Sequence, residues 1–128
     1  MKLLFIYNAK SGPLNAVLGS AHKYIRPKTY KCRLCQLTYS PFAMKRDWKN
    51  FVQQLPYPAE FLHADEFARD YAGHPTELPC IALDRSSAQT TEDDQRLVEL
   101  ISARQFEEIT SLDLLKTELT NAIAKLDE

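Results

Sequence analysis

The chain is 128 residues long, with 45% hydrophobic and 26% charged side chains and a formal net charge of -1. This composition is typical of an ordinary globular domain and argues against a disordered, collagenous or membrane-embedded protein. The longest apolar run, residues 3–7, is far shorter than a membrane span, and the chain turns polar too early for a secretory signal. We therefore expect a single cytoplasmic domain over residues 1–128, large enough to bury one core, that does not bind membranes.

Charge is segregated along the chain. Residues 1–49 contain ten Lys and Arg and one acidic residue, whereas residues 50–128 contain six Lys and Arg and sixteen Asp and Glu. Either the two halves attract each other in the folded protein, or the cations form a surface that binds an anionic ligand or partner. The near-neutral total charge and the lack of an RNA-binding aromatic motif argue against nucleic acid as that partner.

The first expected elements are a strand and a helix. Residues 3–7 are apolar and rich in aromatic and branched side chains, which predicts a buried strand that ends at Asn8. Apolar residues recur at helical spacing over residues 14–25, and Pro27 is suited to end a helix. A helix over residues 14–25 is therefore expected.

The two cysteines separate that helix from a second one. Residues 31–39 hold Cys32 and Cys35 and a short alternation of polar and apolar side chains, which predicts either a strand or an irregular segment. The next helix should have Ser40 as its N-cap and Pro41 at its first position. Its apolar face consists of Met44, Trp48, Phe51, Val52 and Leu55.

The second half begins with a strand and a short helix. Residues 60–64 predict the strand, Asp65 is suited to cap the helix, and Gly73 is suited to end it. The acidic side chains of this half, including Asp84, are explained by such caps and by a solvated loop rather than by catalysis.

Two further apolar runs, residues 80–83 and 97–102, flank a polar loop. This pattern predicts an antiparallel hairpin with a long connection. A final amphipathic helix should follow an N-cap at Thr110 or Ser111.

The order of these elements predicts a mixed α/β domain with helices on both faces of a sheet. Residues 78–83, the following loop, residues 97–102 and the last helix resemble the second half of the thioredoxin fold, in which a cis-proline precedes the third core strand and faces the active site. Cys32 and Cys35, followed by a helix, are similar to the dithiol helix of that fold. The resemblance implies a thioredoxin-like three-layer α/β/α sandwich with a central mixed sheet, and it gives Pro79 the place of the cis-proline.

One feature departs from the minimal thioredoxin pattern, because a separate helix stands between the first strand and the cysteines. Either residues 28–31 form a second strand after an additional N-terminal strand and helix, or the cysteines lie in an insertion. The first arrangement implies a redox centre, whereas the second leaves the role of the cysteines open.

The chain as a whole also resembles a small group of bacterial proteins without an assigned activity. The shared segments are Phe5-Ile6-Tyr7-Asn8 and Tyr30-x-Cys32-x-Leu34-Cys35. Some members carry the label GTPase. This chain has no GxxxxGK[ST] loop to hold nucleotide phosphates, so its sequence does not support that label.

Cys32 and Cys35 carry the most specific chemistry in the sequence. In a dithiol redox site Cys32 would be the exposed, attacking thiolate and Cys35 the resolving thiol. The pKa of Cys32 would be lowered by neighbouring cations, namely Lys31 and Arg33 together with Lys45, Arg46 and Lys49. Pro79, placed opposite, would shape a groove for a thiol or protein substrate. No cofactor is expected for such an exchange.

Two alternatives use the same residues differently. The CxxC spacing supplies half of a tetrahedral zinc site, and the candidates for the other two ligands are His22, His63, His74 and Cys80. Alternatively, Cys32 and Cys35 are buried, inert cysteines of a domain that acts by binding partners. Cys80, the odd third cysteine, stands in an apolar strand and is expected to be a reduced core residue.

Overall fold

The computed structural model of the protein describes residues 1–9, 32–39, 43–74, 76–85 and 96–126. Within them the strands are β1 (Lys2–Ile6), β2 (Ala59–Leu62), β3 (Cys80–Asp84) and β4 (Leu97–Ile101). The helices are α2 (Arg33–Thr38), α3 (Arg46–Gln53), α4 (Ala64–Asp70), α5 (Ala103–Glu108) and α6 (Leu112–Lys125). The helix expected over residues 14–25 lies outside the described residues.

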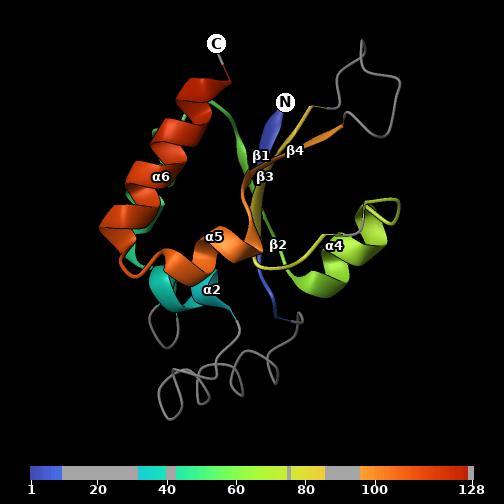
Figure 1. Ribbon diagram of the computed structural model, residues 1–128, viewed down its shortest axis with the longest axis horizontal. Coiled ribbons are helices and arrows are strands. Elements are labelled where there is room, and N and C mark those ends of the chain that lie inside the picture. The colour runs from blue at the N-terminus through green and yellow to red at the C-terminus, as the bar shows by residue number, and fades with distance from the viewer. Residues whose placement is uncertain (10–31, 40–42, 75, 86–95, 127–128) are drawn as a thin grey trace.

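The four strands form one mixed sheet in the order β2-β1-β3-β4 (Figure 1). β1 is parallel to β2, whereas β3 runs antiparallel to both β1 and β4. The hairpin expected in the second half is therefore present as the β3–β4 pair. Ile6 pairs with Cys80, so the last residues of β1 and the first residues of β3 lie at the same end of the sheet.

Helices cover both faces of the sheet (Figure 1). Alternate side chains of β1 point to opposite faces: Leu3 and Phe5 join a large core cluster with residues of α2, α3, α5 and α6, which we call the four-helix face. Leu4 and Ile6 join a smaller cluster with Phe67, which we call the α4 face. Burial on both faces explains why β1 is apolar throughout. The expectation of a mixed α/β sandwich is confirmed.

The segment after Cys32 is helical rather than a strand or an irregular segment. α2 begins at Arg33, with Cys32 as its N-cap, and the Gln36 N–H donates to the Cys32 carbonyl at 3.0 Å. Leu34 and Leu37 are both buried. Their spacing of three residues places them on one face of the helix. The alternation that suggested a strand, Leu37 and Tyr39 against Gln36 and Thr38, covers only the end of this short helix and its C-cap.

α3 starts later than expected, at Arg46 instead of directly after Ser40. Tyr39 and Met44 form an isolated antiparallel bridge, and the backbone of Lys45 is extended. Because Met44 pairs with Tyr39 and Lys45 is extended, the helix begins only at Arg46. Ser40 itself lies outside the described residues.

The starts of α4, α5 and α6 are determined by their N-caps. α4 is capped by His63, whose N–H donates to the Glu66 carboxylate at 2.8 Å, rather than by Asp65. α5 was not expected, although Ser102 and Gln105 form a reciprocal capping box at its start. The expected cap of α6 is confirmed at Ser111. Among the described helices, none is both long and apolar enough to cross a bilayer.

Candidate functional site

Cys32 and Cys35 form a disulfide, with their Cα atoms 5.3 Å apart. The first turn of α2 brings them together, because residues three apart are neighbours on a helix. Cys32 is the N-cap of α2, and its Sγ accepts a hydrogen bond from the Cys35 N–H at 3.2 Å. The CxxC motif is thus a disulfide at the start of a helix, a geometry that is compatible with a redox role.

The disulfide lies in the core of the four-helix face. Only 1% of Cys32 and 9% of Cys35 is exposed, so Cys35 rather than Cys32 is the more exposed of the two. Both belong to the cluster that contains Tyr7, Leu34 and Trp48. Little of the disulfide is therefore accessible to a partner molecule.

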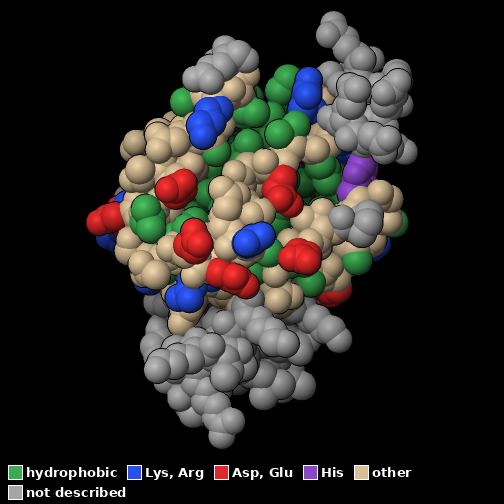
Figure 2. Space-filling view, in the orientation of Figure 1, with side chains coloured by type: hydrophobic (Ala, Val, Ile, Leu, Met, Phe, Trp, Pro, Cys, Tyr) green, Lys and Arg blue, Asp and Glu red, His purple; other side chains and the backbone are tan. Residues whose placement is uncertain are grey.

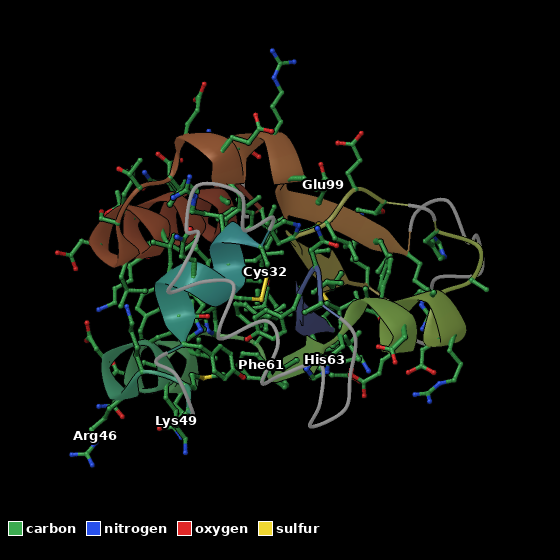
Figure 3. The ribbon with its side chains drawn as sticks, turned by 90° about the horizontal axis from the view of Figure 1, so that it is seen from below. Cys32, Arg46, Lys49, Phe61, His63 and Glu99 are labelled. Carbon is green, nitrogen blue, oxygen red and sulfur yellow. A yellow bond between two sulfur atoms is a disulfide. The ribbon has the colours of Figure 1, made fainter. Side chains whose placement is uncertain are left out.

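The cations expected near the cysteines are dispersed. Arg33 opens α2 directly after Cys32, whereas Lys31 lies outside the described residues. Arg46 and Lys49 project from α3, away from Cys32 (Figure 3). A lowered pKa of Cys32 in the reduced protein therefore stays a prediction that depends on Arg33 and on the backbone of α2.

Pro79 is buried and directly precedes β3, and the Leu78–Pro79 peptide bond is cis. β3 starts at the end of the sheet where β1 finishes, and α2 lies toward that end (Figure 1). Ile81 of β3 belongs to the same core cluster as the two cysteines. The three expected site residues thus lie toward one end of the sheet, although the cysteines alone are joined by a bond.

The Cys80 side chain lies on the opposite face of the sheet from the disulfide. Cys80 pairs with Ile6, whose side chain belongs to the α4 face, and paired residues of neighbouring strands point to the same side. The Cys80 Sγ is 3.7 Å from the Glu99 carboxylate. Burial, reinforced by Glu99, raises the pKa of Cys80 to about 12. Cys80 is a free, buried thiol, as expected for a core residue.

A zinc centre finds no support in the described part of the chain. There, no three His, Cys, Asp or Glu side chains are grouped so that they could hold an ion. The His63 Nδ1 lies 2.6 Å from Glu66 within the cap of α4, and the His74 ring packs against Tyr71. His22, the remaining histidine, lies outside the described residues.

Asp84 is buried, contrary to its interpretation as a cap or loop residue, and is 0% exposed at the end of β3. The Tyr71 hydroxyl donates to its carboxylate at 2.7 Å, and the Arg96 guanidinium donates to both oxygens at 3.3 and 3.4 Å. Arg96 also lies over the Tyr71 ring, 4.6 Å from its centroid. Burial and the bond to Asp84 raise the pKa of Tyr71 to about 12. These side chains satisfy one another, so the group stabilises the α4 face.

Ion pairs connect the basic and acidic halves of the chain. Lys2 pairs with Glu60 across neighbouring strands, and Lys116 pairs with Asp47 at 2.6 Å. Acidic and basic side chains are interspersed over the face seen in Figure 2. The Lys2–Glu60 pair has the sense expected of attraction between the halves, whereas in the Lys116–Asp47 pair the basic half contributes its one acidic residue. An anionic ligand for the cations stays a prediction.

Comparison with protein-family models, with curated proteins and with solved structures gave no match to this chain.

Proposed function

We propose that the protein is a thiol-disulfide redox protein with a thioredoxin-like fold, in which Cys32 and Cys35 open and close one disulfide. The observation that carries this proposal is the disulfide at the N-cap of α2. Its position toward the end of the sheet where Pro79 leads into β3 supports it. The antiparallel β3–β4 pair, followed by α6, supports the fold that the sequence resemblance implies.

The exchange proceeds in two steps. The Cys32 thiolate attacks one sulfur of a partner disulfide RS–SR, which forms a mixed disulfide and releases RS⁻, and that ion takes a proton from water. The Cys35 thiolate then attacks the Cys32 Sγ, which closes the Cys32–Cys35 disulfide and releases the second RS⁻. The protein loses two electrons and the partner disulfide gains them, so no cofactor is required.

The backbone of α2 favours Cys32 as the attacking residue. The Cys35 N–H donates to the Cys32 Sγ, and the same donor serves a Cys32 thiolate after reduction. A hydrogen bond to the ionised form of a group lowers its pKa, and the adjacent Arg33 acts in the same direction. Cys35 is then the resolving thiol.

The low exposure of the pair favours a second candidate, a binding domain in which the disulfide is structural. With 1% of Cys32 exposed, a partner disulfide reaches this sulfur only if the surrounding side chains move. A structural disulfide of this kind resists reduction while the protein is folded, whereas a redox-active one exchanges under native conditions.

Trapping of a mixed disulfide separates the two candidates. In a Cys80→Ala background, reduced Cys35→Ser protein mixed with glutathione disulfide should gain the mass of one glutathione on Cys32. The matched Cys32→Ser variant should react at least about tenfold more slowly. With the wild type, a glutathione buffer without denaturant should interconvert dithiol and disulfide. Reduction that occurs only after urea is added would contradict the redox function and support the structural one.

A further inference from the structure

A groove opens between α3 and the edge strand β2, and we call it the α3–β2 groove. Its floor is apolar, since Val52 is buried and the Phe61 ring stacks on Phe5 with centroids 5.0 Å apart. The groove has a volume of about 400 Å³, within the range of ligand-binding cavities. Its lining consists of Met44, Lys49, Val52, Gln53, Ala59 and Phe61.

The main chain of β2 presents hydrogen-bonding groups at this groove. The Leu3 N–H donates to the Pro58 carbonyl at 2.7 Å, and the pairing with β1 continues at alternate residues. The N–H and C=O groups of Ala59 and Phe61 therefore face away from β1. No described strand lies on that side of β2. An edge with alternate donors and acceptors is a template for an added strand.

The rim of the groove is positively charged. Lys49 lines it, and Arg46 stands one turn earlier on the same helix (Figure 3). Neither side chain forms an ion pair with another residue of the described ranges. Asp47, the acidic residue of α3, is bound instead to Lys116 of α6. The rim thus attracts an acidic partner.

We propose that the α3–β2 groove binds an extended, acidic peptide segment of a partner protein as an added strand on β2. An apolar side chain of the segment enters the groove beside Phe61, and acidic side chains on the same face bind Lys49 and Arg46. An extended backbone is the ligand that matches the outward N–H and C=O groups of β2. A second copy of this chain fits less well, because pairing two β2 edges brings the Lys49 side chains of both copies toward each other.

A pair of degenerate peptide pools tests the site on the full, oxidised chain, independently of the disulfide chemistry. Eight-residue peptides are drawn from valine, isoleucine, phenylalanine, threonine and glutamate, and the matched basic pool has lysine in place of glutamate. Immobilised protein should retain peptides from the acidic pool only. Fluorescence anisotropy with a labelled retained peptide should show that Lys49→Glu weakens binding at least about tenfold, whereas the matched Lys125→Glu reversal on α6 leaves it unchanged.

The backbone contact has its own controls. Ala59→Pro removes the outward N–H of β2 but keeps the pairing with β1, and it should abolish binding. N-methylation of alternate peptide residues should do the same without altering the protein. Failure to retain any acidic peptide, or binding that survives N-methylation as expected of a pocket for a small amphipathic anion, would overturn the proposal. So would a wild-type dimer that Ala59→Pro dissociates, since a second copy would then be the occupant.

Discussion

The two faces of the sheet are stabilised by different chemistry. The four-helix face combines apolar and aromatic side chains with a disulfide. The α4 face combines a smaller apolar cluster with the buried carboxylate of Asp84 and the free thiol of Cys80. Because the backbone of the sheet separates the two sides, the folded protein keeps Cys80 apart from the oxidised pair. The sheet therefore separates the free Cys80 thiol from the Cys32–Cys35 disulfide.

The largest expected effect on stability concerns Trp48, on the four-helix face. Trp48 is fully buried, and its ring meets Phe5 edge to face at 5.7 Å, yet its Nε1 has no hydrogen-bond partner among the described residues. Its contribution is therefore packing. Trp48→Ala should lower the free energy of unfolding by about 3–5 kcal/mol in urea titrations followed by circular dichroism. The half-buried neighbour Phe51 is the matched control, and Phe51→Ala should cost less. Equal losses would show that Trp48 is not central to this face.

The disulfide should contribute less than Trp48. It closes a very short loop between Cys32 and Cys35, three positions apart in sequence. The entropy of closing such a loop corresponds to about 2 kcal/mol. Urea unfolding without and with dithiothreitol should give a free energy of unfolding that is higher by this amount in the oxidised wild type than in the reduced one. The same difference is expected in Cys80→Ala. If the difference disappears in Cys80→Ala, the stabilisation by the Cys32–Cys35 disulfide depends on Cys80 on the other face of the sheet.

Local patterns predicted much of the fold. The apolar runs of β1 and β3 and the Ser111 cap each depend on neighbours in sequence, and each was found where it was expected. α5 was missed although its signal, Ser102 followed three residues later by Gln105, is also local. α5 has a single buried residue, Phe106, so no apolar periodicity accompanies the capping box.

Long-range contacts account for the rest. The late start of α3 follows from the Tyr39–Met44 bridge, and the burial of Asp84 follows from its contact with Arg96, 12 positions further along the chain. The sequence identified Cys32 and Cys35 as a pair but left a disulfide and a zinc site open, since the choice depends on which distant side chains approach. The α3–β2 groove had no sequence signal either, because its lining comes from separate elements.

On the α4 face, a single hydroxyl should have a measurable effect. Tyr71→Phe removes the donor at 2.7 Å from the Asp84 carboxylate but keeps the ring under Arg96. Loss of one hydrogen bond to a buried charge should lower the free energy of unfolding by about 1–2 kcal/mol. Tyr57→Phe, at a half-buried tyrosine of the four-helix face, should change it by less than about 0.5 kcal/mol. If the two variants are equally stable, the Tyr71 hydroxyl is not needed to satisfy the Asp84 carboxylate.

The smallest expected effect is the alkaline titration of Cys80. The pKa of its thiol is about 12 in the folded protein and near 9.0 in an ordinary environment. Since the raised pKa favours the neutral thiol in the folded state, its contribution to stability is complete below pH 9 and is lost as pH rises from about 9 to 12.

In a Cys32→Ser/Cys35→Ser background, which prevents disulfide exchange, the stability of the parent relative to its Cys80→Ala derivative should fall by about 1 kcal/mol between pH 8 and pH 10. The other titrating groups are common to both proteins and cancel in the comparison. A difference that stays constant with pH would mean that Cys80 ionises as easily in the folded chain as in the unfolded one, and the sheet would then not shield this thiol.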